Sequence, residues 1–475
     1  MLTLLLVMML PALSWAQLPL TDCTLSHPGH ALVVRASCGT LEVPLDHDRA
    51  EAGGLSLQFA VIPAENSSTK ATPLFFFAGG PGQSAMSVAA ILVQLRNSVG
   101  KDRDLVFIDQ RGTGQSVALD CPPDEDLQHL ISDDSRIARE TGKCRDALTV
   151  DPAYFTSYQA VHDVELLRQA LGYEKINLLG VSYGTRMAQL YLKAYPTAVR
   201  SVVLDGVIPL TVVLGPEFSK NLHASLELLL QACKKSKTCA QTFPQLSGDW
   251  QAYLQIPLRE KRELSMAHPR TGKTLDVVVD REVMDSALRM LSYSNITQVM
   301  LPLLLHATIE GDWRPLISQA LQVAASLESE LSLGMHNSVI CSEDVPFMQA
   351  APPVTGGSLL NRLQQQLELI CQHWPKGKVF ADQHGIPVFN APALLLSGEL
   401  DPVTPPRYGV QAAKHFTRSR HIEVSGQGHN VMEKGCIPKL IRRFFNELQL
   451  TDERVKCVKD TAKLPFFIDL LGPAA

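Results

Sequence analysis

Short apolar runs alternate with stretches of helical periodicity from Leu41 onward, and this alternation constrains the fold more than any other feature. Several of the runs lack polar alternation, as expected of strands that helices cover on both faces. Helical patterns lie between them at 158–172 and 184–196. Such alternation predicts an α/β protein with a mostly parallel central sheet flanked by helices. Five early runs are predicted as strands: LSLQFAVIPA (55–64), PLFFFAGG (73–80), DLVFIDQRG (104–112), INLLGVS (176–182) and SVVLDGV (201–207).

The strand rhythm stops after about Val207 and resumes only late in the chain. The intervening residues are rich in Leu, Gln, Ser and Ala at helical spacing, with one candidate strand at 274–280. A segment of about 180 residues is too long for a structureless loop in a compact protein. We therefore predict a core in two parts, 17–207 and 390–475, interrupted by a large, mainly helical cap at 208–389.

The sequence GVSYG (180–184) is the only G-x-S-x-G in the chain, and it joins a predicted strand to a predicted helix. A tight turn here forces its central residue into strained backbone angles, and flanking glycines remove the collisions that bulkier residues would make. The hydroxyl of Ser182 would then stand exposed at a helix N-terminus, where backbone N–H groups stabilise negative charge. This context predicts a nucleophilic serine; a helix-capping serine is the alternative.

An acid and a histidine follow Ser182 in the chain order that hydrolases with this turn use. Asp401 follows the apolar run ALLLSGEL, and His429 lies in SGQGHNV, directly after the next predicted strand. We predict that His429 takes the proton from Ser182 and returns it to the leaving group, while Asp401 orients the imidazole. Glu399 is the alternative acid.

A tetrahedral intermediate needs hydrogen-bond donors for its oxyanion. We predict that the backbone N–H groups of Tyr183 and Gly80 supply them, since Gly80 lies in the glycine-rich loop of FFFAGGPGQSA (75–85). A simple Gly-Pro turn is the alternative for this loop. Asp109 and Arg111 follow another predicted strand, and we predict that they fix a turn by an ion pair; a contact with substrate is the alternative.

Three motifs, G-G-P-G (79–82), D-Q-R-G-T-G-Q-S (109–116) and G-V-S-Y-G-T (180–185), resemble those of the α/β-hydrolase fold, as do the loops of Asp401 and His429. More narrowly, the chain looks like the proline iminopeptidase and tripeptidyl aminopeptidase family of secreted serine peptidases. The resemblance extends over nearly the whole mature chain and includes a TAP-like C-terminal portion.

The resemblance implies release of N-terminal residues, either proline or short peptides such as tripeptides, from substrates with a free N-terminus. A buried carboxylate in the cap would pair with the substrate ammonium group and reject internal peptide bonds. The candidates are Glu343 and Asp344 in HNSVICSEDVPF (336–347), with a solvated acidic turn as the alternative. Ala78 stands where proline iminopeptidases usually carry histidine, and this departure favours the tripeptidyl branch.

The first residues, MLTLLLVMMLPALSWAQ, have the pattern of a secretory signal peptide (1–16) cleaved after Ala16, although no Lys or Arg precedes the apolar run. A membrane anchor is the alternative, but the run is shorter than the roughly 20 residues that span a bilayer. We therefore predict a secreted or periplasmic protein with no stable membrane insertion after cleavage.

All ten cysteines lie beyond this segment, and they lack the paired spacing of zinc sites. In an exported protein they predict up to five disulfides; free buried thiols in a cytosolic protein are the alternative. We expect pairing between sequence neighbours, because each bond would close one local loop: Cys23–Cys38, Cys121–Cys144, Cys233–Cys239, Cys341–Cys371 and Cys436–Cys457.

The composition narrows the remaining classes of function. A formal net charge of −5 with 45% hydrophobic residues shows no basic excess for nucleic-acid binding. No metal-ligand cluster, Walker loop or dinucleotide fingerprint is present, so we expect no metal and no cofactor. Two alternatives to a peptidase stay open: a carboxylic ester hydrolase that uses the same triad, and a non-catalytic binding protein on a hydrolase scaffold.

Overall fold

The computed structural model describes residues 18–27, 31–66, 71–122, 134–328, 330–349, 359–360 and 362–473, so the predicted signal peptide lies outside the described residues. Nine strands form the central sheet, in the order β1-β2-β3-β5-β4-β6-β7-β10-β11. Their bounds are β1 (Thr21–Ser26), β2 (Val33–Pro44), β3 (Gly54–Ile62), β4 (Leu74–Phe77), β5 (Leu105–Ile108), β6 (Ile176–Val181), β7 (Val199–Asp205), β10 (Ala393–Gly398) and β11 (Ser419–Val424).

The six strands from β5 to β11 in this order pair in parallel, whereas β1, β2 and β3 form an antiparallel edge. The predicted mostly parallel sheet is therefore confirmed, and the five predicted early strands correspond to β3 to β7. The residues of β4, β5, β6 and β10 are buried throughout, which explains why these runs carry no polar alternation.

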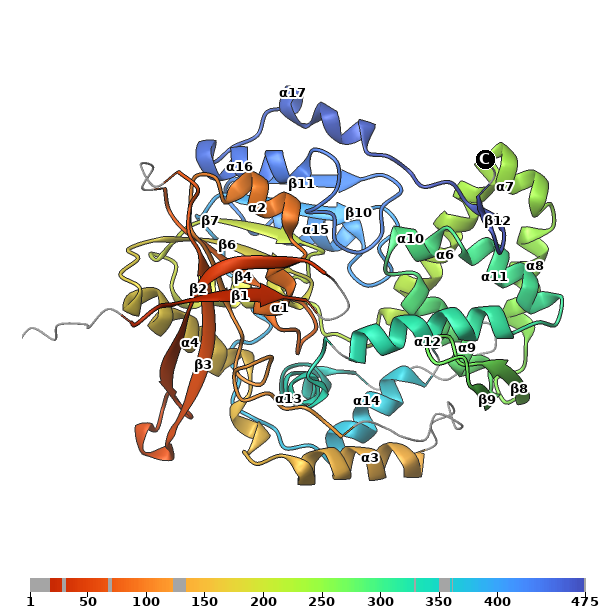
Figure 1. Ribbon diagram of the computed structural model, residues 1–475, viewed down its shortest axis with the longest axis horizontal. Coiled ribbons are helices and arrows are strands. Elements are labelled where there is room, and N and C mark those ends of the chain that lie inside the picture. Colours follow the sequence, from red (N-terminus) through yellow and green to blue (C-terminus); the bar gives the residue numbers. More distant parts are fainter. Residues whose placement is uncertain are drawn as a thin grey trace, which may run out of the picture.

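Helices cover both faces of the sheet (Figure 1). Successive strand residues point to opposite faces, so Phe75 and Phe77 belong to one core cluster and Leu74 and Phe76 to the other. The first cluster includes side chains of α4 (Ser157–Ala170) and α5 (Tyr183–Ala194). The second includes those of α1 (Ala85–Ala89), α2 (Val93–Val99) and α16 (Ile437–Glu447).

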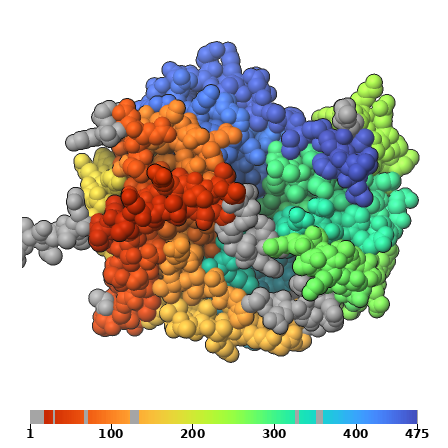
Figure 2. All heavy atoms as spheres, viewed as in Figure 1, coloured from red at the N-terminus to blue at the C-terminus, as the bar shows by residue number. Residues whose placement is uncertain are grey.

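Residues between β7 and β10 form the cap, which lies beside the sheet on the side away from β1 to β3 (Figures 1 and 2). The cap has a hydrophobic core of its own, in which Trp250 and Trp313 are buried. Its helices are α6 (Phe218–Lys235), α7 (Lys237–Thr242), α8 (Leu246–Gln255), α9 (Arg281–Leu291), α10 (Asn295–Gln298), α11 (Leu301–Ile309), α12 (Arg314–Glu328), α13 (Leu333–Glu343) and α14 (Leu363–Gln372).

The cap also carries a two-stranded hairpin, β8 (Arg262–Ala267) and β9 (Thr274–Val279). β9 confirms the candidate strand at 274–280. β8 is absent from the prediction because its side chains alternate between half-buried and exposed, and its sequence, RELSMA, contains no apolar run. α3 (Asp134–Ala147) precedes α4 and packs against α14.

The C-terminal residues return to the cap after α15 (Pro406–Ala413), α16 and α17 (Asp452–Val455). The N–H of Phe467 in β12 (Phe467–Asp469) donates to the carbonyl of Val299 at 3.1 Å. β12 pairs with β13 (Gly472–Pro473) beside α7 and α11. The end of the segment predicted as core thus lies against the cap.

Five disulfides join the ten cysteines, and all five neighbour pairs predicted from the sequence are confirmed. One of them, Cys341–Cys371, links α13 to α14 inside the cap. Among the described residues, no helix has both the length and the apolar character needed to cross a membrane.

Candidate active site

Ser182 lies in the turn between β6 and α5, with φ 54° and ψ −121°. A positive φ is uncommon for any residue other than glycine, and it marks backbone strain at this position. The Ser182 side chain forms no capping hydrogen bond to the helix, although Ser182 occupies the position before its first residue. The strained turn therefore presents a half-buried hydroxyl for which the described residues supply no hydrogen-bond partner.

Both glycines that flank Ser182 are required by close backbone contacts. A Cβ atom on Gly180 would collide with the carbonyl group of Gly184. A Cβ atom on Gly184 would collide with the carbonyl oxygen of Phe77, at the end of β4. The glycines therefore let the helix start directly against the sheet, which is the geometry expected of a nucleophile turn.

Asp401 and His429 are in direct contact, although both come from loops at the ends of separate strands. The Nδ1 atom of His429 lies 2.7 Å from Oδ2 of Asp401. Asp401 also accepts hydrogen bonds from the N–H of Val403 at 2.8 Å and from the Thr404 hydroxyl at 2.7 Å. Glu399, the alternative acid, instead accepts from the Ser425 hydroxyl at 2.6 Å. The geometry therefore favours Asp401 as the orienting acid.

The electrostatics of this pair suit a general base. Burial opposes the charged form of Asp401, but the charge and hydrogen bond of His429 hold the pKa of Asp401 below its usual value. Burial likewise opposes the charged form of His429, yet the negative charge of Asp401 raises the pKa of His429 above its usual value. A histidine with a raised pKa is a stronger base, and its Nδ1 atom is fixed by the carboxylate, so Nε2 stays available for a proton.

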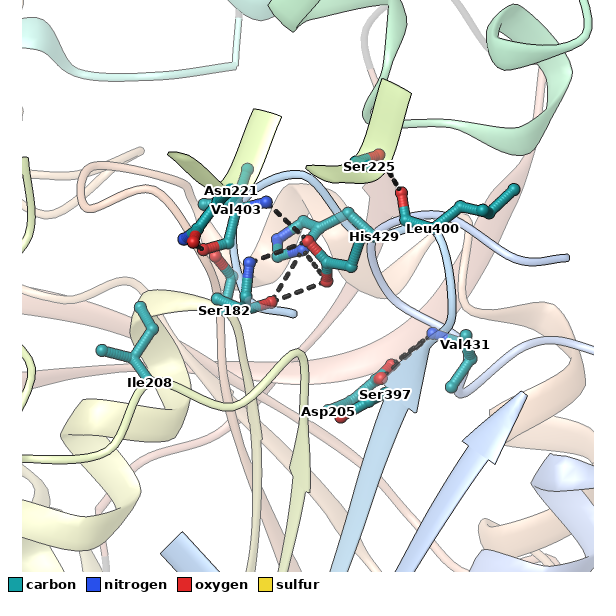
Figure 3. A network of polar contacts seen from close by, with 12 residues as sticks. Ser182, Asp205, Ile208, Asn221, Ser225, Ser397, Leu400, Val403, His429 and Val431 are labelled. Carbon is teal, nitrogen blue, oxygen red and sulfur yellow. Dashed lines mark hydrogen bonds and ion pairs between the residues drawn. The ribbon is translucent and has the colours of Figure 1, made fainter. Parts of the chain in front are cut away.

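Ser182 and His429 both border the end of β7. The N–H of Ser182 donates to the carbonyl of Asp205 at 2.9 Å. A Cβ atom built on the next residue, Gly206, would lie 3.0 Å from Cε1 of His429. Figure 3 draws both side chains in the same cluster. Among the described residues, no hydrogen bond yet joins the Ser182 hydroxyl to the imidazole, a contact that often tightens only when substrate binds.

The glycine-rich loop borders Ser182 on the other side. A Cβ atom on Gly79 would lie 3.4 Å from Cβ of Ser182, and Gly80 has a φ of 104°. The loop is held by the cap, because the N–H of Ser332 donates to the carbonyl of Gly82 at 2.9 Å. Tyr183 is the first residue of α5, where the N–H has no acceptor within the helix. Tyr183 thus directly follows Ser182, and Gly80 belongs to the loop that borders it; the roles of both as oxyanion donors stay predictions.

Glu343 is fully buried and belongs to a hydrogen-bond network beneath the nucleophile turn. Its carboxylate accepts from the N–H of Ser157 at 2.7 Å, from the Ser157 hydroxyl at 2.8 Å and from the side-chain amide of Gln383 at 2.9 Å. The Ser157 hydroxyl also lies 2.6 Å from the phenol oxygen of Tyr183. Burial raises the pKa of Glu343 to about 7. Glu343 thus positions Tyr183 through Ser157.

Asp344 is also fully buried, in an ion pair with Arg186 of α5 at 2.8 Å. It accepts a further hydrogen bond from the N–H of Leu214 at 2.7 Å. Every carboxylate oxygen of Glu343 and Asp344 thus has a donor from the protein. The arrangement gives no support to the predicted amine-binding role, and the alternative of a solvated acidic turn is contradicted by their burial.

We expect Glu343→Gln to lower the free energy of unfolding by about 1–3 kcal/mol, because an amide would turn N–H groups toward donors that now bond to a carboxylate. Turnover of a free-amine peptide amide and of an acetyl ester should fall by the same factor, since Tyr183 serves both reactions. Urea unfolding and parallel kinetics would measure the two effects. A loss restricted to the free-amine substrate would instead make Glu343 an amine ligand.

The predicted ion pair between Asp109 and Arg111 is wrong. Arg111 pairs with Asp163 of α4 at 2.6 Å. Asp109 instead accepts from the Ser84 hydroxyl at 2.7 Å, and also from backbone N–H groups that include that of Met86. Each side chain therefore fixes a different part of the chain, because each has its own partners on another element.

The cap holds both loops that carry the acid and the histidine, which the sequence did not reveal. On α6, the Ser225 hydroxyl donates to the carbonyl of Leu400 at 2.8 Å (Figure 3). The side chain of Asn221 donates to the carbonyl of Val403 at 3.1 Å. The carbonyl of Tyr293, just after α9, accepts from the N–H of His429 at 2.8 Å. The cap therefore contributes directly to the geometry of the pair.

Asp205 at the end of β7 fixes the histidine loop from the core side. Its buried carboxylate accepts from the N–H of Val431 at 2.8 Å (Figure 3). It also accepts from the N–H of Met432 at 2.8 Å. Burial raises the pKa of Asp205 to about 7. The histidine loop is thus held by hydrogen bonds from both the sheet and the cap.

Two families match the chain in separate segments. Residues 72–240 match the family described as "alpha/beta hydrolase fold", and this segment contains Ser182 and the glycine-rich loop. Residues 358–457 match the family described as "TAP-like protein", and this segment contains Asp401 and His429. The two matches therefore divide the candidate triad between them and leave most of the cap unmatched.

Three curated relatives illustrate the similarity. "Serine protease Hip1" of Mycobacterium tuberculosis is 32% identical over 204 residues, which cover 40% of this chain and 39% of the relative. "Tripeptidyl aminopeptidase" of Streptomyces lividans is 30% identical over 190 residues, which cover 36% of this chain and 35% of the relative. "Carboxylesterase B" of Mycobacterium tuberculosis is 24% identical over 465 residues, which cover 89% of this chain and 86% of the relative. The chain thus spans less than half the length of the first two relatives.

Proposed function

Since the chain has the α/β-hydrolase fold and carries a TAP-like C-terminal portion, we propose that it is an exported serine exopeptidase. It releases N-terminal residues, proline or short peptides such as tripeptides, from peptides with a free N-terminus, through an acyl-enzyme. The names of the serine protease and tripeptidyl aminopeptidase relatives support this class of reaction. The matched residues cover less than half of each relative, so the substrate of this chain is part of the proposal.

One observation carries the proposal. A strained turn presents the half-buried Ser182 hydroxyl, which has no hydrogen-bond partner among the described residues, beside the histidine loop, and a fully buried carboxylate lies 2.7 Å from the imidazole. A buried Asp–His pair next to an unpartnered serine hydroxyl is the arrangement that nucleophilic acyl transfer requires.

In the first half-reaction, the Ser182 oxygen attacks the scissile carbonyl carbon while Nε2 of His429 takes the hydroxyl proton. Asp401 stabilises the imidazolium that forms, and the N–H groups of Tyr183 and Gly80 stabilise the oxyanion. The intermediate then collapses: the C–N bond breaks, His429 gives its proton to the leaving amine, and the N-terminal part of the substrate stays esterified to Ser182.

In the second half-reaction, a water molecule replaces the leaving amine. His429 takes a proton from this water, which attacks the ester carbonyl carbon, and the same donors stabilise the second oxyanion. The C–O bond to Ser182 breaks, and His429 returns the proton to the serine oxygen. The enzyme is then restored and the N-terminal fragment leaves as a free acid.

The five disulfides support action outside the cytoplasm, since such bonds persist in oxidising compartments. The predicted cleavage after Ala16 belongs to the same proposal. N-terminal sequencing of the protein recovered from the periplasm or the medium would test it, with Gln17 expected as the first residue.

The proposed activity can be tested with a panel of prolyl-, other aminoacyl- and tripeptidyl-amides, each with a free and an acetylated N-terminus. We expect cleavage of free-amine substrates and at least about tenfold slower cleavage of acetylated ones, which corresponds to about 1.4 kcal/mol of lost interaction. Mass spectrometry of a mixed peptide library would report the length of the fragment released. Hydrolysis of simple esters alone, with equal rates for free and blocked N-termini, would contradict a peptidase.

A carboxylic ester hydrolase is the second candidate function. It is favoured by the similarity to the protein named carboxylesterase B, which extends over 89% of this chain. The chemistry of the triad does not distinguish an ester from an amide. The same substrate panel with short acyl esters therefore separates the two functions.

A further inference from the structure

Arg289 is a cation of the cap for which the described residues supply no acidic partner. It lies near the end of α9, half-buried, with its guanidinium carbon 4.7 Å from the ring centre of Phe218 and 5.7 Å from that of Tyr293. Within the described part of the chain, it forms no ion pair and no hydrogen bond to a carboxylate. Its contacts with the protein are therefore aromatic, and the five N–H donors of its head are left for another group.

This situation contrasts with that of three of the four buried arginines in the described part of the chain, each of which has a carboxylate within 2.8 Å; the fourth, Arg103, donates to Asn446. Those ion pairs satisfy the charge inside the protein and fix the fold. An arginine that stacks on aromatic rings but lacks a carboxylate is held in one orientation without being neutralised. The paired arginines are Arg111 with Asp163, Arg186 with Asp344 and Arg281 with Asp285.

Arg289 lies on the active-site side of the cap. The ring of Tyr293 meets that of His429 edge-on at 5.4 Å, and the Tyr293 carbonyl accepts the His429 N–H. The charge of Arg289 acts against protonation of two imidazoles, those of His429 and His336. Burial and this charge lower the pKa of His336 to about 4, so His336 is neutral at pH 7.

The other aromatic partner of Arg289 leads to the nucleophile. Phe218 packs against the cluster that contains Ile208, three residues after Asp205. The carbonyl of Asp205 accepts the Ser182 N–H at 2.9 Å. Arg289 thus contacts Tyr293, whose ring adjoins His429, and Phe218, whose cluster lies close in sequence to the residue that bonds to Ser182.

We infer that Arg289 binds the C-terminal carboxylate of a short leaving group, so that the enzyme prefers peptides that end soon after the scissile bond. This inference rests on the proposed function. The planar guanidinium offers two parallel N–H donors to a carboxylate. His429 delivers its proton to the leaving group, so the leaving group must lie on the side of the site where Tyr293 and Arg289 stand. Each residue extends a peptide by about 3.3–3.6 Å, so a carboxylate held beside Tyr293 implies a leaving group of only one or two residues.

The test compares substrates that differ only in this carboxylate. The acyl unit is the proline or tripeptide unit that the enzyme releases fastest from a coumarylamide, and it is joined to Ala, to Ala-amide or to Asp-amide. We expect the wild type to favour the free acid over Ala-amide by about 10- to 100-fold in kcat/KM, the range of a charge-assisted contact. In Arg289→Gln this ratio should fall to near one.

Removing the charge of Arg289 also changes the pKa of His429. The ratio of kcat/KM for the free acid to that for Ala-amide, measured at one pH, is unaffected by this change, because both substrates use the same imidazole. Arg289→Lys keeps the charge but not the planar pair of donors, and it should keep only part of the preference. The matched control is Arg270→Gln, which removes the same charge from an exposed turn of the cap and should keep the full ratio. A preference for Asp-amide equal to that for the free acid would overturn the C-terminal carboxylate in favour of an acidic side chain.

Failure of this inference differs from failure of the proposed function. Cleavage of the amides with no preference for the free acid would leave the peptidase standing and overturn the role of Arg289. If no peptide is cut, para-acetoxybenzoate and para-acetoxybenzamide provide the same comparison on an ester. A preference for the acid that Arg289→Gln removes would then support the anion site and contradict the peptidase; equal losses on both esters would overturn the inference.

Discussion

Replacing Ser182 with alanine should lower kcat/KM by at least about 10⁴-fold while the protein stays folded. The substitution removes the only atom that forms the acyl-enzyme, and the remaining rate comes from substrate binding and the oxyanion donors. The thermal midpoint should change little, because the hydroxyl makes no hydrogen bond to the helix that it precedes. Steady-state kinetics, circular dichroism and thermal melting on the same preparation would check both parts.

The matched control for this variant is Ser397→Ala. Ser397 lies on β10, four residues before Asp401, and its hydroxyl lies 3.0 Å from a nitrogen of His421. It should retain activity within a few-fold of the wild type. Equal activity of Ser182→Ala and the wild type would end the assignment of the nucleophile. A wild type that turns over no substrate of the panel, yet binds peptides, would favour the non-catalytic binding protein.

Asp401→Asn should lower kcat by about 10³- to 10⁴-fold, the second-largest effect expected. The side-chain amide can donate to Nδ1 of His429, so it selects the tautomer that cannot accept the serine proton. It also leaves the imidazolium without a negative charge. Glu399→Gln is the matched control, because its carboxylate bonds to Ser425 and Gly426 rather than to the imidazole. A larger loss from Glu399→Gln than from Asp401→Asn would reverse the assignment of the acid.

The pH profile offers an independent measurement on the same variant. Activity requires the neutral imidazole, so the acid limb of kcat/KM follows the pKa of His429. Asp401 raises this pKa above its ordinary value of 6.5, and the limb of the wild type should therefore lie above pH 6.5. Asn carries no charge, so the limb of Asp401→Asn should move to lower pH. A limb that stays in place would mean that Asp401 does not act on His429.

The parts of the fold and site that were predictable from the sequence are those with local signals. Buried strands flanked by helices have continuous apolar sequences. The nucleophile turn requires glycine at 180 and 184, because backbone atoms occupy the space that a Cβ atom would need. Asp401 and His429 follow strands, and the carboxyl ends of parallel strands meet at one edge of the sheet. Cysteines that are close in sequence could pair without knowledge of the fold.

The parts that were not predictable depend on contacts between distant residues. In the sequence, Glu343 has the pattern of an exposed acidic residue. Its hydrogen bond from Ser157, 186 positions earlier, becomes evident only in the structure. Arg111 pairs with Asp163 of another element, not with Asp109 two residues away. Tyr293 holds the histidine loop through its backbone carbonyl. Every residue has such a carbonyl, so the residue type at this position does not indicate the contact. Arg289 likewise stands out only in the structure, where no described carboxylate lies beside its guanidinium group.

The hydrogen bonds from the cap to both catalytic loops bear on how this enzyme can be engineered. A cap taken from another protein would have to reproduce an acceptor at the position of Tyr293 and donors at those of Asn221 and Ser225, or the grafted chimera would lose rate as well as selectivity. Libraries aimed at new selectivity are therefore better built on side chains that face the substrate than on exchange of the whole cap.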